Sequence, residues 1–232
     1  MAVRQVAPGL YMVPLGMVNV YLFEDKDALV LVDTGIPGST VRILAAVREL
    51  GRQPTDVKRI LVTHLHGDHT GSLARLKQVT GATVAMHATD AELVSQGRTS
   101  RPSNPAPGVL NWLVVKLFMS ATSLDRIEPV DTDDELADGD LLDVAGGVQV
   151  IHVPGHAAGQ VAFLWSQHGG VLLAADAASN MVRLGYPFVF EDEEKGKTSL
   201  QKLTGLEFET ACFGHGAPII GGAAGRFRQK WH

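Results

Sequence analysis

One short segment decides how this sequence is interpreted: Thr63-His64-Leu65-His66-Gly67-Asp68-His69-Thr70-Gly71. It places three histidines and one aspartate within six positions, directly after an apolar run that predicts a strand. Imidazole nitrogens bind zinc, manganese or iron, and a carboxylate offsets the charge of a second cation. Because the chain has only nine histidines in 232 residues, such a cluster is a rare coincidence unless it binds metal. An extended stretch puts His64 and His66 on one side and Gly67 allows a turn, so the spacing fits two adjacent metal ions better than one.

On both sides of this segment, strand and helix patterns alternate. β-branched and aromatic residues between Gly, Pro and Asp predict strands, and apolar residues at helical spacing predict two helices. The predicted strands are Leu10–Val13, Asn19–Phe23, Ala28–Val32, Arg59–Thr63 and Ala82–His87. The predicted helices run from Ser39 to Gly51 and from Ser72 to Gly81. Such alternation is typical of α/β folds.

The later half of the chain repeats the alternation. Its predicted strands are Val148–Val153, Val161–Trp165, Val171–Ala175 and Ala211–Phe213. A capping-box pattern, Thr198 with Gln201, predicts a short helix, and the acidic run over 191–194 predicts a solvated loop. Two buried-type strands, LVLVDTG and VLLAADA, each deliver an aspartate at their carboxyl ends, Asp33 and Asp176.

An apolar segment, GVLNWLVVKLFMS over 108–120, follows a Pro- and Ser-rich connection over 98–108. Its apolar residues share one helical face, and Trp112 extends the apolar surface beyond that face. A helix that is apolar around most of its circumference is normally buried, and the alternative is that it covers a pocket or a partner. We expect burial and keep a lid as the alternative.

Together these patterns resemble the metallo-β-lactamase superfamily. Its His-x-His-x-Asp-His signature is matched without a gap by His64, His66, Asp68 and His69. Further along, VPGHAAGQ is similar to the second metal segment and contains His156, and CFGHGAP is similar to the last one and contains His215. LLAADA is similar to the strand that ends in the family's bridging carboxylate, and LVLVDTG to the segment with its buried aspartate. The resemblance covers about residues 10–220, with all motifs in order.

The resemblance implies an αββα four-layer sandwich, formed by a single domain over 1–232, with a metal centre at one edge. His64, His66 and His156 would hold one divalent ion, and Asp68, His69 and His215 the other. Asp176 would bridge the two ions. Asp33 would orient a ligand, and the alternative for Asp33 is a cap of the turn before Gly35. The expected ions are two Zn²⁺, with manganese or iron as alternatives.

The activity implied by the resemblance is hydrolysis at a binuclear site. A bridging hydroxide would attack the carbonyl carbon of an ester, lactone or thioester in a small molecule. Asp68 is the candidate catalytic residue, which would orient the hydroxide and pass a proton to the leaving group. Three alternatives stay open: an oxygenase with one iron that resembles persulfide dioxygenases, a thioesterase that resembles glyoxalase II, and a metal-binding regulator without turnover.

Departures from better-known branches of the superfamily narrow the choice of substrate. Lactonases of similar size commonly have Tyr three residues after the bridging Asp, where this chain has Ser179. Glyoxalase II members carry a basic helical extension, whereas only Arg226, Arg228 and Lys230 follow the last motif here. The interpretation that remains is a small hydrolase that acts on esters, lactones or thioesters.

Specificity is expected in NMVRLGYPFVF, the segment that follows Asp176 by a few residues, and in the apolar segment over 108–120. The candidate substrate contacts are Arg183, Tyr186, Phe188 and Trp112, with ordinary packing as the alternative. The other histidines are expected to be structural or solvated: His87, His152, His168 and His232. Cys212 is expected to be a buried, inert thiol.

Composition favours a globular protein and disfavours several other classes. With 45% hydrophobic and 19% charged residues, the chain is neither disordered nor a coiled coil. Its 20 basic and 25 acidic residues give a net charge of -5 without a basic stripe, which disfavours nucleic-acid binding. The longest apolar stretch is shorter than the roughly 20 residues of a membrane-spanning helix, and the first residues do not form an export signal. We therefore expect a cytoplasmic protein with a small-molecule substrate and no membrane partner, and a homodimer remains an option.

Overall fold

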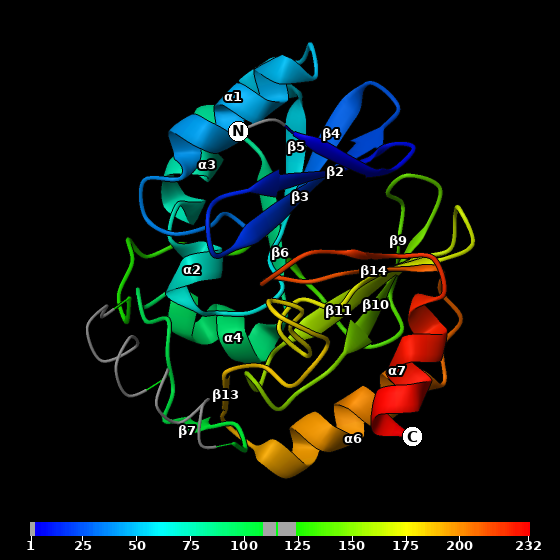
Figure 1. Ribbon diagram of the computed structural model, residues 1–232. Coiled ribbons are helices and arrows are strands. Elements are labelled where there is room, and N and C mark those ends of the chain that lie inside the picture. The colour runs from blue at the N-terminus through cyan, green and yellow to red at the C-terminus, as the bar shows by residue number, and fades with distance from the viewer. Residues whose placement is uncertain (1–2, 109–114, 116–123) are drawn as a thin grey trace.

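The structure is a computed structural model that describes residues 3–108, 115 and 124–232. Two sheets pack face to face at its centre (Figure 1). The strands of the first sheet lie in the order β1 (Arg4–Ala7), β2 (Leu10–Pro14), β3 (Asn19–Asp25), β4 (Ala28–Val32), β5 (Val57–Leu61), β6 (Thr83–Met86) and β8 (Asp134–Glu135). Strands β1 to β4 pair antiparallel, and β4, β5, β6 and β8 pair parallel.

The second sheet has six strands. Their order is β15 (Ile219–Ile220), β14 (Thr210–Cys212), β12 (Val171–Leu173), β11 (Val161–Trp165), β10 (Val148–His152) and β9 (Leu141–Leu142). All neighbours are antiparallel except β12 and β14, which are parallel. A separate small ladder pairs β7 (Asn104–Pro105) with β13 (Val189–Phe190).

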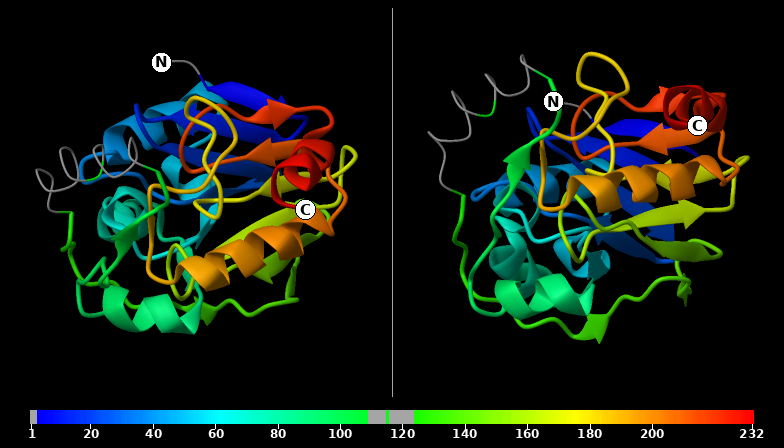
Figure 2. Two further views of the ribbon diagram at one scale, coloured as in Figure 1. Left: turned by 60° about the horizontal axis from the view of Figure 1, so that its bottom comes forward. Right: turned by 90° about the horizontal axis from the view of Figure 1, so that it is seen from below.

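Helices cover the outer faces of both sheets. On the side of the first sheet lie α1 (Thr40–Glu49), η1 (Pro54–Asp56), α3 (Leu73–Thr80) and α4 (Ala88–Val94), with the short α2 (Gly67–Thr70) at the edge. On the side of the second sheet lie α6 (Glu193–Thr204) and α7 (Ala223–Trp231). Figures 1 and 2 show the two helix layers on opposite sides of the paired sheets. The expected αββα architecture is confirmed, and none of the helices in the described ranges is long and apolar enough to cross a bilayer.

Alternation along the central strands explains the four layers. In β3, Val20 and Leu22 join the cluster beneath α1 and α3, whereas Tyr21 and Phe23 face the second sheet. Phe163 of β11 meets them from the other side and is fully buried. Because successive side chains of a strand point to opposite faces, a strand that is apolar at every position must be covered on both.

The sequence correctly predicted most of the central elements. Helices α1 and α3 and the strands from β2 to β4 lie within a few residues of their expected places. The strand expected over Arg59–Thr63 runs from Val57 to Leu61, so Thr63 already belongs to the loop that carries the histidines. The segment with Trp112 lies outside the described residues.

A helix forms where the Thr198 pattern predicted one, but the predicted start of this helix and the loop predicted over 191–194 were wrong. Helix α6 begins at Glu193, and Asp192 caps it by accepting the N–H of Lys195 at 3.0 Å. Thr198 lies inside the helix and donates its hydroxyl to the carbonyl of Glu194. Aspartate is at least as good a cap as threonine, and acidic residues are favoured in a first helical turn, so the acidic run starts a helix and is no solvated loop.

Helix α4 begins at a histidine that interacts with a second one. Nδ1 of His87 accepts the N–H of Thr89 at 3.3 Å, and its ring stacks on that of His152 with centroids 4.3 Å apart. Burial and the neighbouring His152 lower the pKa of His87 from 6.5, and the carboxylates of Asp90 and Glu135 only partly oppose them. The cap requires the neutral imidazole.

This arrangement predicts a pH dependence of stability. Because the folded pKa of His87 lies below its ordinary value of 6.5, the unfolded chain takes up the proton first as the pH falls, and stability is lost below about pH 6.5. We expect His87→Asn, which keeps a capping side chain, to lose less unfolding free energy than the parent between pH 7 and pH 5. Urea unfolding of the metal-free proteins measures this, with the exposed His168→Asn as control. Equal losses in parent and His87→Asn would contradict the assignment.

Candidate metal centre

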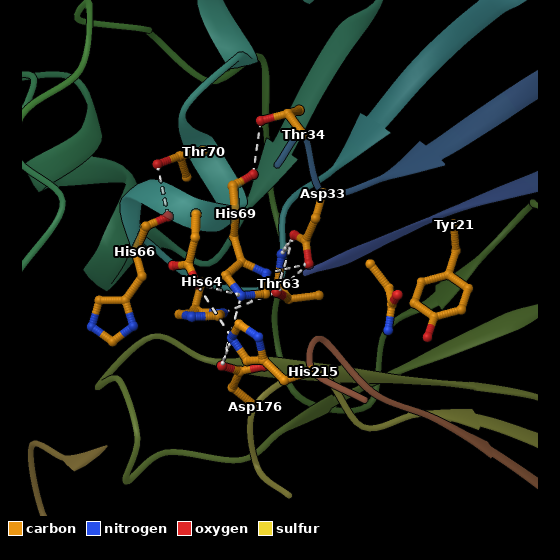
Figure 3. A network of polar contacts seen from close by, with 12 residues as sticks. Tyr21, Asp33, Thr34, Thr63, His64, His66, His69, Thr70, Asp176 and His215 are labelled. Atoms are coloured by element: carbon orange, nitrogen blue, oxygen red, sulfur yellow. Dashed lines mark hydrogen bonds and ion pairs between the residues drawn. The ribbon is translucent and has the colours of Figure 1, made fainter. Parts of the chain in front are cut away.

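Seven potential ligands meet at one edge of the sandwich, although they come from distant parts of the sequence. The loop after β5 and the start of α2 supply the first four, and the loops after β10, β12 and β14 supply one each. They are His64, His66, Asp68, His69, His156, Asp176 and His215. Figure 3 shows most of them converging between the two sheets. Sequence motifs as much as 151 positions apart, between residues 64 and 215, therefore form one cluster.

The cluster divides into overlapping groups of three. His64, His66 and His156 form the first, and Asp68, His69 and His215 form the second. A third group, His64, His69 and Asp176, connects them, and the ligand atoms of each group lie within 4.8 Å of one another. In the first group, Nδ1 of His66 lies 2.9 Å from Nε2 of His156. In the second, Nε2 of His215 lies 3.2 Å from Oδ2 of Asp68.

Asp176 lies between the two groups. Its Oδ2 is 3.6 Å from Nε2 of His156, 3.7 Å from Nε2 of His69 and 3.0 Å from Nε2 of His215. Only 5% of its side-chain surface is accessible. Gly214 permits this approach, because a Cβ atom there would lie 2.1 Å from Oδ1 of Asp176. One buried carboxylate therefore faces both groups, which is the position that a bridging ligand requires.

The histidines are held by their outer nitrogens. Nδ1 of His156 faces the carbonyl of Val189 at 2.9 Å, and Nδ1 of His215 faces the carbonyl of Met17 at 2.7 Å. Nδ1 of His64 and of His69 are held in the same way by Thr63 and Asp33. These contacts fix the rings and leave the Nε2 atoms for the centre of the cluster.

Several inner atoms lack a protein partner. Within the described residues, Nε2 of His64, Nε2 of His69 and Oδ1 of Asp176 are buried without a hydrogen bond. A buried polar atom without a partner costs about 1–3 kcal/mol, so native proteins rarely retain several of them in one place. Divalent cations would satisfy these atoms, and the donor set of imidazoles and carboxylates suits zinc, manganese or iron.

The two groups differ electrostatically. Burial and the neighbouring His156 lower the pKa of His66 to about 3, and burial also lowers the pKa values of His64 and His156. In the second group, the carboxylates of Asp176 and Asp68 outweigh the effect of burial and raise the pKa of His215 to about 10. The first group therefore presents neutral imidazoles, whereas the carboxylates of the second group hold a proton on His215 that a metal ion would have to displace.

Asp33 supports ligands of both groups. Its Oδ2 lies 2.8 Å from Nδ1 of His69, and it accepts the backbone N–H and the hydroxyl of Thr63 (Figure 3). Because the Thr63 hydroxyl donates to Asp33, it is free to accept Nδ1–H of His64 at 3.0 Å. Asp33 thus orients His69 directly and His64 through Thr63, and its contacts match the ligand-orienting alternative. Its φ of 62° is unusual for a residue other than glycine, and aspartate tolerates it better than most.

Two residues of β3 that the sequence analysis did not single out position His215. The side-chain amide of Asn19 donates to the carbonyls of Phe213 and Gly216, at 3.2 and 2.8 Å. The hydroxyl of Tyr21 donates to the same carbonyl of Phe213 at 2.8 Å. The sequence did contain a signal for this role. Asn19 and Tyr21 lie on one face of the predicted strand Asn19–Phe23, and polar groups buried there need hydrogen-bond partners.

The candidate substrate contacts have different surroundings. The ring of Phe188 lies 5.9 Å from that of His215, next to the cluster. Tyr186 packs against Phe190 and Trp231, and Arg183 is exposed. Trp112 falls outside the described residues. Cys212 is fully buried, which raises its pKa, in agreement with an inert thiol.

Comparison with known proteins identifies the family. The model of the metallo-β-lactamase superfamily matches residues 13–215. A hydroxyacylglutathione hydrolase of Cereibacter sphaeroides is 30% identical over 87% of this chain and 67% of its own length. The probable metallo-hydrolase YflN of Bacillus subtilis is 27% identical over 94% of this chain and 87% of its own length. These relatives agree with the expected general class, a metal-binding hydrolase of this superfamily.

Solved structures show the same fold. A metallo-β-lactamase with a HARLDQ motif from Cronobacter sakazakii superposes with a TM-score of 0.72 at 21% identity, covering 93% of this chain and 81% of its own. A class B3 di-zinc metallo-β-lactamase from an Alaskan soil metagenome gives a TM-score of 0.70 at 24% identity, covering 93% and 78%. With signature, fold and relatives in agreement, the chain belongs to the metallo-β-lactamase superfamily.

Proposed function

We propose that this chain is a hydrolase whose centre holds two divalent cations, most simply zinc, and that it cleaves an ester, lactone or thioester in a small molecule. In this proposal, His64, His66 and His156 bind one cation. Asp68, His69 and His215 bind the other, and Asp176 bridges the two. The whole of 1–232 acts as one domain.

The direction of the imidazole rings carries this proposal. In four of the five histidines an oxygen of the protein holds Nδ1, which leaves Nε2 for a cation. Most metal-binding histidines have such an outer bond, because it fixes both the ring orientation and the tautomer. The position of Asp176 between the two groups supports two cations rather than one.

When bound, two such cations supply a hydroxide nucleophile near neutral pH and an electrophile for a carbonyl oxygen. The carboxylates of Asp68 and Asp176 offset only two of four positive charges, so the loaded centre favours a polarised carbonyl or an anionic substrate. The Asp68 side chain is 29% exposed, compared with 5% for Asp176. We therefore assign proton transfer to Asp68: its carboxylate takes the proton of the attacking water and returns it to the leaving alcohol or thiol.

The segment after Asp176 is the proposed wall of the substrate site. Phe188 is the favoured contact because its ring adjoins that of His215. Arg183 is exposed and offers a positive charge to an anionic end of the substrate. Tyr186 ranks below both, since it packs against Trp231.

Within this class, thioester hydrolysis is the candidate that the relatives favour. Several of them are named hydroxyacylglutathione hydrolases, and the one from Cereibacter sphaeroides is 30% identical. This chain spans 67% of that relative's length. Thioesters, with that of glutathione among them, therefore belong in the substrate panel.

A substrate panel tests the proposed function. The protein is stripped with a chelator, reloaded with zinc, manganese or iron, and assayed with esters, lactones and thioesters. We expect hydrolysis of at least one class, lost on stripping and restored by metal. Fully loaded protein that cleaves none of them would overturn the proposal in favour of a regulator, and oxygen uptake with a persulfide would overturn it in favour of an oxygenase.

Removing single ligands tests the assignment of the centre. We expect His66→Ala to bind about one cation fewer than the parent and to lose turnover by several orders of magnitude, because hydrolysis requires both cations. Asp176→Ala should weaken both sites at once. Elemental analysis and initial rates measure this, with His168→Ala as a control for an exposed histidine. Full metal content in His66→Ala would contradict the assignment.

Asp33 provides a prediction about the support of the ligands. In Asp33→Asn the side chain can no longer accept from both His69 and Thr63, so metal affinity should fall about tenfold to hundredfold. Thr63→Val removes the hydroxyl that bonds to both Asp33 and His64 but leaves the contact between Asp33 and His69, so it should have the smaller effect. Thr63→Ser keeps the hydroxyl and should bind metal like the parent. Competition with a chromophoric chelator gives the affinities. If Asp33→Asn binds metal as tightly as the parent, Asp33 only shapes the turn before Gly35.

A further inference from the structure

A second buried carboxylate, Asp90, lies behind the first group of ligands. It belongs to α4 and is fully inaccessible to solvent. Its Oδ2 accepts the N–H of Leu65 at 3.1 Å, and its Oδ1 accepts the N–H of Gly159 at 3.0 Å. Leu65 lies between His64 and His66, and Gly159 lies three positions after His156. One carboxylate thus joins the two loops that together carry the three-histidine group.

Arg101 holds Asp90 in place and connects it to Glu191. Nη1 of Arg101 donates to Oδ1 of Asp90 at 2.6 Å and lies 3.4 Å from Oε1 of Glu191. Oε2 of Glu191 accepts the N–H of Ala158 at 2.8 Å. The His156 loop is thus bound by a second carboxylate besides Asp90. The Arg101 side chain is 21% exposed and that of Glu191 only 9%. Ion pairs screened so little by water are costly to break by removing one partner.

The packing around Asp90 is equally specific. A Cβ atom at position 159 would lie 2.5 Å from Cγ of Asp90, so only glycine allows the loop to approach the carboxylate this closely. Gly155, on the other side of His156, is just as confined, since a Cβ there would lie 2.2 Å from Cα of Gly196. The His156 loop is therefore closely packed at both ends, and Asp90 connects its Gly159 end to the backbone of Leu65.

Asp33 does not duplicate this role. In the described part of the chain its side chain bonds to Thr63 and His69, and it reaches neither His66 nor His156. Those two rings bring Nδ1 and Nε2 to within 2.9 Å of each other, although they come from separate loops. The distance between the His66 and His156 rings therefore depends on the contacts that join their two loops.

We propose that Asp90, held by Arg101, is a positioning residue that sets the distance between the His64/His66 loop and the His156 loop and so keeps the three-histidine group ready for its cation. This inference rests on the proposed function only in that the three histidines bind a metal. In this proposal two buried carboxylates support the histidines in different ways. Asp33 orients the rings of His64 and His69, and Asp90 sets the spacing of the two loops.

The test separates the two groups by mutation. In a His215→Ala background the three-histidine group is the better site, and in a His66→Ala background the Asp68/His69/His215 group is. Adding Asp90→Asn places an amide N–H₂ against backbone N–H donors and weakens the pair with Arg101. We expect zinc or cobalt affinity to fall about tenfold to hundredfold in the first background and to change less than about threefold in the second. Chelator competition and the visible spectrum of bound cobalt provide the readouts.

Hydrogen exchange tests the same inference without metal. In the metal-free protein, Asp90→Asn should speed exchange in peptides that cover 64–66 and 156–160, while peptides of α1 and α7 keep the parent rates. Asp133→Asn is the matched control, because Asp133 also accepts a backbone N–H and pairs with a cation, Lys77, away from the centre. Arg101→Ala replaces Asp90→Asn if the latter does not fold.

Three results would overturn the inference: unchanged affinity in the first background, an equal loss in both backgrounds that follows the loss of thermal stability, or unchanged exchange in the two loops. A parent protein that binds no metal would overturn the proposed function instead, and the exchange experiment would still decide the role of Asp90.

Discussion

The structure depends on one constraint: five imidazoles and two carboxylates are gathered in one largely buried cluster. Each buried atom without a partner would cost about 1–3 kcal/mol, and several such atoms point at the same small volume. The chain holds the outer nitrogens of four of these five rings with carbonyls, a hydroxyl and a carboxylate, so the inner atoms of these rings have little freedom to find other partners. Such an arrangement is favourable only when cations complete it, and this explains why the rest of the fold is arranged around the edge where they would bind.

Different parts of the sandwich bring these side chains together and hold them in place. Strand ends of both sheets bring the ligands to one edge, and the apolar faces between the sheets keep those ends in register. Polar side chains of β3 reach across to the segment of His215. Asp33 and Asp90 contact the histidine loops from the side away from the cluster. Asp33 bonds to the ring of His69, and Asp90 bonds to the loop backbone. The ligands are therefore placed by groups that do not themselves face the centre.

The seven candidate ligands could be selected from the sequence because their chemistry is concentrated in short motifs, and the structure brings them together. His64, His66, Asp68 and His69 follow one another within six positions, and His156, Asp176 and His215 lie in segments similar to those of a known family. Asp90, Arg101 and Glu191 have no such motif. Asp90 belongs to a short helix, Arg101 to the Pro- and Ser-rich connection and Glu191 to the acidic run, and only the fold shows that their charges lie together. The wrong start of α6 has a related cause, since local capping patterns compete and Asp192 prevailed over Thr198.

The metal content of the protein, purified without added metal or chelator, tests the central claim most directly. Elemental analysis with a parallel protein determination gives the number of ions for each chain. The account predicts about two divalent ions, zinc or manganese or a mixture, in agreement with two groups that share Asp176. About one iron for each chain, together with oxygen uptake when a persulfide is added, would contradict it.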